Sequence, residues 1–189
     1  MIYMKKILFI VNVDWFFISH RLPIALAAIK QGYEVHLACR LTDKKKSLEK
    51  LGIHVHSLNL TRGNINILGE FKILKQLFFI FKLVKPDLVH LITVKPILLG
   101  GILARIFKTP AVVISFSGLG LVFKNKKSNK IISLLFYLAL SNKNQKIIFQ
   151  NNHDRLNISK IKSEAYVESE IIKGSGVDLS LFSTVENKE

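Results

Sequence analysis

The sequence holds few residues of the kinds that cross-link a chain or anchor it in a membrane. It has one cysteine, Cys39, in 189 residues. This excludes an internal disulfide framework and agrees with a reducing compartment. Free cysteine usually behaves as a small buried hydrophobe, so we expect Cys39 to be buried at a strand end. The longest run without charge, 109–123, contains a proline and two glycines. It is shorter than the ~20 residues that cross a bilayer, and the N-terminus lacks a signal-peptide pattern.

Several catalytic and cofactor motifs are also absent. No zinc-type Cys/His cluster, phosphate-binding P-loop or G-x-S-x-G elbow occurs. His54 and His56 share one face of a predicted strand, but without a nearby carboxylate or cysteine they predict no metal site. Gly118-Leu119-Gly120 lacks the third glycine of the dinucleotide fingerprint and does not follow the first strand. An NAD-dependent oxidoreductase is therefore only a minor alternative.

Acidic residues are scarce: 13 Asp and Glu stand against 28 Lys and Arg, a net charge of +15. This excess suits nucleic acid, an anionic membrane surface or phosphate-bearing small molecules, and a general bias toward lysine on solvated surfaces is the open alternative. Nucleic acid is least favoured, because the lysines do not interleave with aromatics in a recognisable module. Residues 71–84 carry a narrow lysine stripe on an otherwise apolar helix, and lysines at 124–130 precede the apolar run 131–140. Both segments are typical of buried helices or of helices that lie in a bilayer interface.

The composition, 49% hydrophobic and 22% charged, is globular, and apolar runs of strand length alternate with longer helical patterns. The strands are predicted at 6–13, 33–39, 53–58, 87–93, 111–116, 146–150 and 169–173. Helices are predicted at 22–31, 43–51, 67–84, 97–107, 129–141 and 152–160. Continuous apolar strands indicate a sheet covered on both faces. The fold class is therefore α/β, a Rossmann-like, doubly wound and mostly parallel sheet of about seven strands.

Ligands of such sheets bind beyond the carboxyl ends of the strands. The candidate residues are those that follow each strand: Asp14, Trp15, Phe16, His20 and Arg21 in a predicted loop; His90, Thr93 and Lys95; Ser117, Gly118, Leu119 and Gly120; and Asn151. Aromatic rings stack on sugars, and basic groups hold phosphate oxygens. Trp15 and Phe16 as core contacts, and His90 as a core histidine, remain open alternatives.

Seven short motifs occur in a characteristic order along the chain. They are the strand 6–13, Ser19-His20-Arg21-Leu22-Pro23, Gly32-Tyr33-Glu34-Val35, 85–90 with Thr93, Lys95 and Pro96, Gly118-Leu119-Gly120 with Phe123, Phe149-Gln150-Asn151, and Gly174-Ser175-Gly176-Val177-Asp178 with Phe182. In this order they resemble the N-terminal domain of bacterial family 4 glycosyltransferases, which have the two-domain GT-B architecture. Asp14-Trp15-Phe16-Phe17 replaces the glycine-rich turn of many relatives, which fits a surface-polysaccharide subfamily that uses polyprenyl-diphosphate carriers.

The resemblance implies that residues 1–173 form the acceptor-binding domain. Residues 174–189 would then be the interdomain linker, with Gly174, Gly176, Val177 and Asp178, and the start of a second half whose donor-binding domain is missing. This half would bind no cofactor, since the nucleotide-sugar belongs to the missing domain. Trp15 and Phe16 would contact sugar or lipid, His20, Arg21 and Lys95 the diphosphate, and His90 and Thr93 the acceptor hydroxyls. Residues 117–120 and Asn151 would shape the interdomain cleft.

The expected function is transfer of a sugar to a lipid-linked saccharide at the cytoplasmic surface of the inner membrane. We expect little transfer by this chain alone, and no catalytic residue is assigned. Two alternatives stay open: the acceptor subunit of a split enzyme, whose donor domain is a separate polypeptide, and a non-enzymatic module that binds the membrane surface.

Overall fold

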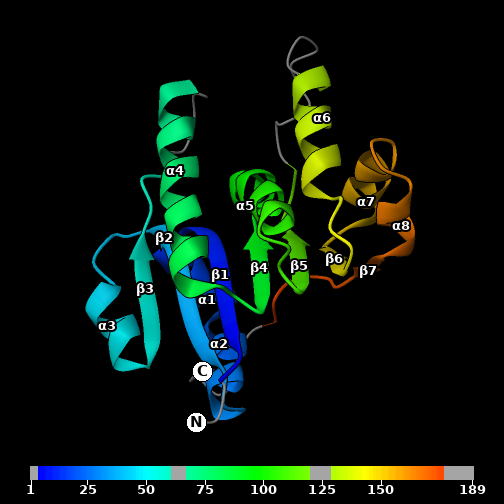
Figure 1. Cartoon of the computed structure of the whole chain (residues 1–189). Helices are drawn as coiled ribbons and strands as arrows, with labels where there is room; N and C mark the ends of the chain where they lie inside the picture. Colours follow the sequence, from blue (N-terminus) through cyan, green and yellow to red (C-terminus); the bar gives the residue numbers. More distant parts are fainter. Residues whose placement is uncertain (1–3, 61–66, 120–128, 177–189) are drawn as a thin grey trace, which may run out of the picture.

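The computed structural model describes residues 4–60, 67–119 and 129–176. Its centre is a seven-stranded sheet in the order β3-β2-β1-β4-β5-β6-β7, with every pair of neighbours parallel (Figure 1). The strands are β1 (Lys6–Val13), β2 (Glu34–Arg40), β3 (Ile53–Ser57), β4 (Leu88–Ile92), β5 (Ala111–Phe116), β6 (Gln145–Phe149) and β7 (Ser169–Ile171). All seven predicted strands are confirmed, and so is the Rossmann-like α/β class.

The helices are α1 (Asp14–His20), α2 (Leu22–Lys30), α3 (Lys45–Lys50), α4 (Ile67–Val84), α5 (Val94–Ile106), α6 (Asn129–Ala139), α7 (Asn152–Ser159) and α8 (Glu164–Val167). Two apolar cores lie on opposite faces of the sheet, and each is covered by its own set of helices. Phe17, Ala25 and Leu48 bring α1, α2 and α3 against one face of the sheet. Residues of α4 to α8 form the core on the other face, and Figure 1 shows α5 between α4 and α6.

Three local predictions were wrong. Residues 14–20, predicted as a loop, form α1, because Phe17 is fully buried and its ring meets the Phe9 ring edge-on, 5.5 Å between centroids. Helix α5 begins at Val94 instead of residue 97, and the four-residue α8 was not predicted. Cys39 is buried at the end of β2, as expected, and burial raises the pKa of its thiol to about 12.

A close contact between α5 and α6 fixes the helical layer. A Cβ atom added at Gly101 would lie 2.7 Å from the backbone oxygen of Ala139 and 2.9 Å from its Cβ. The Asn142 amide closes the contact by donating hydrogen bonds to the carbonyls of Gly101 (3.3 Å) and Ala139 (2.9 Å). Glycine is therefore required at this position by backbone proximity.

We expect Gly101→Ala to lower the free energy of unfolding by roughly 1–3 kcal/mol, the usual cost of overpacking, measured by urea denaturation. Gly100→Ala is the matched control, because its nearest neighbours are the side-chain ends of Leu91 and Ile10, which can move. In a helix without this contact, alanine would stabilise by up to about 1 kcal/mol. Stabilisation by Gly101→Ala would therefore contradict the packing described.

Candidate functional site

The order of the strands reverses between β1 and β4, which are neighbours in the sheet. In open α/β sheets the ligand crevice lies at this point, beyond the carboxyl ends of the strands. Asn12 precedes the last residue of β1, and Thr93 follows β4 directly. Both carry a buried side-chain oxygen, Asn12 Oδ1 and Thr93 Oγ1, that has no hydrogen-bond partner within residues 4–60, 67–119 and 129–176. Polar atoms left in this condition are costly inside a protein, so a ligand that supplied a partner would bind favourably.

Thr93 also has an unusual backbone. Its φ of 72° and ψ of 160° lie outside the regions that residues with a side chain normally adopt. Such strain costs on the order of 1–3 kcal/mol and is concentrated at functional sites. Thr93 lies between the end of β4 and the first turn of α5, so its conformation sets the boundary between strand and helix at the switch point.

Arg21 lies at the junction of α1 and α2 and is buried. Its Nη1 donates to the carbonyl of His20 at 2.8 Å and to Ser175 Oγ at 2.7 Å, whereas Nε is buried and has no hydrogen-bond partner among the described residues. Burial lowers the pKa of the guanidinium, but arginine stays charged in proteins. The Ser175 contact joins the predicted linker to the α1–α2 junction. Arg21 thus offers a desolvated cation with an unused donor.

His90 is buried in β4, next to this arginine. Its Nε2 hydrogen-bonds to Ser115 Oγ of β5 at 2.8 Å, and its ring packs 5.3 Å from that of Phe9. Burial first, and then the charge of Arg21, lower the pKa of His90 to about 3. The imidazole is therefore neutral at physiological pH, and it is a satisfied core histidine that adjoins the site.

The side chains of α1 are of two kinds: some are buried and hold neighbouring loops, and others are exposed. The Asp14 carboxylate is buried and accepts hydrogen bonds from the backbone N–H of Thr42 (2.7 Å) and from its hydroxyl (2.9 Å). Asp14 therefore holds the loop after β2. Trp15 is exposed, and the rings of Phe16 and His20 stack with centroids 4.1 Å apart. The structure thus offers aromatic surface beside Arg21.

Lys95, on the first turn of α5, takes part in an ion pair. Its Nζ lies 2.6 Å from Glu70 Oε1, and both side chains are about four-fifths buried. This contact ties the beginning of α4 to that of α5. The predicted contact between Lys95 and a diphosphate would therefore require this ion pair to open.

Two of the predicted cleft residues meet through Asp154. The N–H of Leu119 donates to Asp154 Oδ2 at 3.2 Å, and the Asn151 amide donates to the same oxygen at 3.0 Å. Asn151 also caps α7, since its Oδ1 accepts from the N–H of Asp154 at 2.8 Å. Gly118, with a φ of 105°, makes the turn after β5, next to Ser117. Gly120, Val177 and Asp178 lie outside the described residues.

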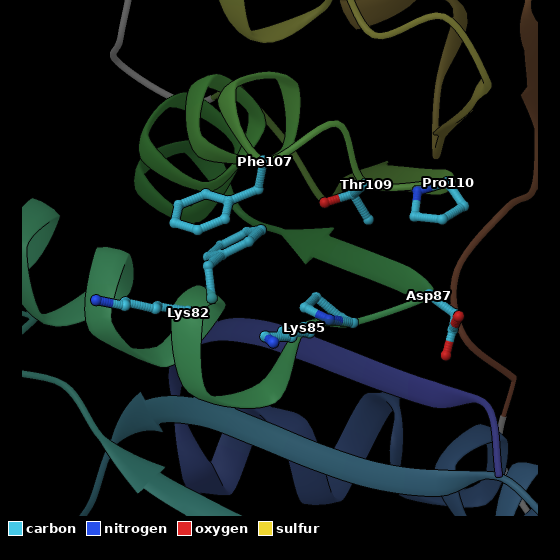
Figure 2. Close-up of a pocket in the computed structure, with 8 residues that line it drawn as sticks. Lys82, Lys85, Asp87, Phe107, Thr109 and Pro110 are labelled. Atoms are coloured by element: carbon cyan, nitrogen blue, oxygen red, sulfur yellow. The ribbon is translucent and has the colours of Figure 1, made fainter. Parts of the chain in front are cut away.

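A hollow of about 360 Å³ lies at the opposite edge of the sheet from the switch point, where β4 and β5 begin. Figure 2 shows Lys82 and Asp87 at opposite sides of it, with Lys85, Phe107, Thr109 and Pro110 between them. The Phe81 and Phe107 rings stack at 5.5 Å. Its one buried polar atom without a partner is Thr109 Oγ1. The edge at which the strands begin thus has fewer buried polar atoms without a partner than the switch point has.

Sequence reasoning assigned no role in the site to Asn12, Ser115, Asp154 or Ser175. Ser115 was detectable as a lone hydroxyl in an apolar strand. Asp154 was detectable from its spacing, because Asn-x-x-Asp is close to a capping box. Ser175 carries no comparable signal, since its contact spans 154 residues. Among the described residues, no group of three or more His, Cys, Asp or Glu side chains is arranged to hold a metal ion.

His90 predicts an acid-labile fold. Because its folded-state pKa is about 3, the unfolded chain, with an ordinary histidine pKa near 6.5, takes up the proton first as the pH falls. The contribution of His90 to the free energy of unfolding is fully present above pH ~6.5 and declines as the pH falls towards ~3. Between pH ~7.5 and ~5, the free energy of unfolding should fall by about 2 kcal/mol more for wild type than for His90→Gln, which does not titrate. Urea denaturation at both pH values measures this. His153→Gln is the control, because His153 is exposed on α7, and it should lose as much stability as wild type. Equal losses in wild type and His90→Gln would contradict the buried, neutral state of His90.

Comparison with known proteins gives the family. Residues 6–151 match the glycosyl transferase 4-like family. No curated protein sequence matches the chain. Among solved structures, similar ones include Anabaena HepE in complex with UDP and glucose (TM-score 0.61, 18% identity, 97% of this chain and 48% of that chain). A glycosyltransferase from Rickettsia africae (0.60, 18%, 90% and 43%) and the UDP-GlcNAc 2-epimerase of Methanocaldococcus jannaschii (0.61, 17%, 89% and 45%) are also similar.

These identities support the fold alone, one Rossmann-like half of a GT-B architecture. The chain spans about half the length of the solved structures that it matches. The family match covers most of the described residues, including β1, the switch point and Asn151. The chain therefore belongs to the glycosyl transferase 4-like family.

Proposed function

We propose that this domain binds the acceptor of a glycosyltransferase that transfers a sugar from a nucleotide-sugar to a lipid-linked saccharide. The observation that carries the proposal is the buried guanidinium of Arg21, with its unpartnered Nε, in a chain of this family. A diphosphate linking lipid and sugar is an anion that such a group holds well, because charge-assisted hydrogen bonds are strong in a desolvated setting.

The surrounding groups fit the two ends of this acceptor. Trp15 and the stacked Phe16 and His20 rings offer apolar faces to a sugar or a prenyl chain. Thr93 Oγ1 offers a hydroxyl for the acceptor sugar. We assign the diphosphate to Arg21, with His20 beside it; Lys95 joins only if its ion pair with Glu70 opens. Asp14 is left out because its carboxylate is used by Thr42.

The nucleotide-sugar is assigned to a second, donor-binding half. It would belong to the same polypeptide or to a separate one, as in a split enzyme. The segment containing Ser175, which Arg21 holds, would be the connection between the halves.

We assign the reaction to polysaccharide synthesis at the membrane surface, and the exposed apolar and basic side chains of α4 and α6 support the membrane location. No described helix is long and apolar enough to cross a bilayer. On α4, Phe71, Phe79 and Leu83 are 66%, 55% and 73% exposed. On α6, Ile131, Leu134 and Tyr137 are exposed as well, and exposed lysines lie on both helices. An anionic bilayer interface matches this combination of apolar side chains and positive charge.

The same surface favours one alternative function, a non-enzymatic module that binds membranes. That module would bind vesicles without needing the Arg21 site.

The diphosphate assignment predicts the behaviour of Arg21→Lys. Lysine keeps the charge but loses the guanidinium geometry, so binding of farnesyl diphosphate, a soluble prenyl diphosphate, should weaken roughly 10- to 100-fold, the equivalent of about 1.5–3 kcal/mol. Isothermal titration calorimetry measures this.

Ser175→Ala is the matched control, because it removes the contact with the linker and leaves the guanidinium in place. It should bind within a few-fold of wild type. Equal affinity of Arg21→Lys and wild type, or equal losses in both variants, would contradict the proposal.

The membrane assignment predicts that the double variant Phe79→Ser/Leu83→Ser binds phosphatidylglycerol-containing vesicles more weakly. Each side chain removed from the interface should cost on the order of 1 kcal/mol, or about 5-fold in partitioning. Co-sedimentation with vesicles measures the change, and added salt should weaken binding by wild type. Ile24→Ser on α2 is the control, since Ile24 is 50% exposed on the opposite side of the sheet. Equal losses of vesicle binding in Phe79→Ser/Leu83→Ser and in Ile24→Ser would contradict the membrane assignment.

A further inference from the structure

The hollow between the ends of α4 and α5 lies outside the switch-point site (Figure 2). It is found where β4 and β5 begin, whereas the substrates of open α/β sheets bind where the strands end. Its volume of about 360 Å³ is that of a small-molecule site, for which about 300–1,000 Å³ is usual. A ligand bound here would therefore be distinct from the acceptor, and its binding does not depend on the proposed function.

Aromatic and proline rings form the apolar part of the hollow. Phe81, Pro86, Phe107 and Pro110 are among its lining residues. The Phe107 ring lies 5.5 Å from the Phe81 ring and 5.1 Å from the ring of Phe78, so two neighbours hold it in place. Rigid rings of this kind offer flat apolar surface to a ligand at little entropic cost. The lining thus fits a flat, apolar ligand body.

Thr109 supplies a hydrogen-bonding group next to these rings. Its Oγ1 is buried and has no hydrogen-bond partner in the part of the chain that the structure describes. The backbone around it is fixed, because the N–H of Thr109 donates to the carbonyl of Ala104 at 2.9 Å. A buried hydroxyl without a partner is unfavourable, and a ligand oxygen placed against it would accept its proton.

Basic residues outnumber acidic ones around the hollow. Lys82 and Lys85 line it, Lys108 is next to Thr109 in the chain, and all three are exposed. Among the described residues neither Lys82 nor Lys85 forms an ion pair. Asp87 Oδ2 accepts a hydrogen bond from the N–H of Lys6 at 2.7 Å. The C-terminal ends of the two helices add about half a negative charge each, which the lysines exceed. The hollow therefore favours an anionic group.

We infer that this hollow binds a small aromatic carboxylate. The ring of the ligand packs on Phe107 and the two prolines, and its carboxylate accepts hydrogen bonds from Thr109 Oγ1 and from the amine of Lys85. Figure 2 shows Phe107, Thr109 and Pro110 along one side of the hollow and Lys85 across from them. Helix α5 runs from Thr93, at the switch point, to this hollow. The ligand thus contacts a helix that reaches the acceptor site without competing for that site.

The first test is fluorescence titration with 2-naphthoate and with its neutral isostere, 2-naphthamide. Wild type should bind one equivalent of naphthoate, roughly 5-fold more tightly than naphthamide. Lys85→Gln should weaken naphthoate binding about 3- to 5-fold, since the amine is exposed and partly screened. Lys108→Gln is the matched control: it removes the same charge, and its φ of 51° equals the 50° of Lys85, but Lys108 does not line the hollow. Lys108→Gln, and Arg21→Lys at the switch point, should bind as wild type does.

The second test uses Thr109→Val, which keeps the shape of the side chain and removes the hydroxyl. Naphthoate binding should weaken roughly 2- to 10-fold. The melting temperature of the free protein should stay the same or rise by up to about 4 °C, because a buried polar atom without a partner is lost. A hydroxyl with a purely structural role would give a lower melting temperature instead.

Four results would overturn the inference. They are the absence of saturable naphthoate binding by wild type, equal affinities for naphthoate and naphthamide, losses in Lys108→Gln or Arg21→Lys as large as that in Lys85→Gln, and a lower melting temperature of Thr109→Val.

Discussion

The pairing of β1 with β4 is the constraint on which the rest of the structure depends. The chain first adds β2 and β3 on one side of β1 and then returns to add β4 on the other. Because such crossovers are right-handed, α1 to α3 cover one face and the later helices cover the other. The reversal also leaves the ends of β1 and β4 without a helix running directly across both. Asn12 and Thr93 lie there, each with a buried side-chain oxygen that no other described group hydrogen-bonds.

Most of the fold was predictable from the sequence because the buried strands are continuous apolar runs. All seven strands were found within a few residues. The errors occurred where tertiary contacts override local pattern. Residues 14–20 contain three aromatics in seven residues and no helical repeat long enough to recognise, yet burial of Phe17 makes them helical. Helix α8 has only four residues. Periodicity does not identify elements of this length.

The site was predictable at the level of the sheet edge but not of individual contacts. Topology alone brought Arg21, His90 and Thr93 towards one edge. It did not indicate that the Asp14 carboxylate accepts hydrogen bonds from Thr42 or that Lys95 forms an ion pair with Glu70, because these partners come from other loops and helices. The same limit applies to the histidines of β3. The sequence shows that His54 and His56 share a face, but not that His36 and Glu34 lie beside them, because that depends on the register of β2 with β3.

The central claim is that the buried guanidinium of Arg21 receives a diphosphate at the switch point. Its Nε–H group reports on this directly, because that donor is buried and has no hydrogen-bond partner in the part of the chain that the structure describes. NMR of arginine side chains in ¹⁵N-labelled protein, titrated with farnesyl diphosphate, follows this one resonance. If the diphosphate binds at Arg21, the Nε–H signal should shift saturably, with the affinity measured by calorimetry. An unchanged Arg21 signal at saturating ligand would contradict it.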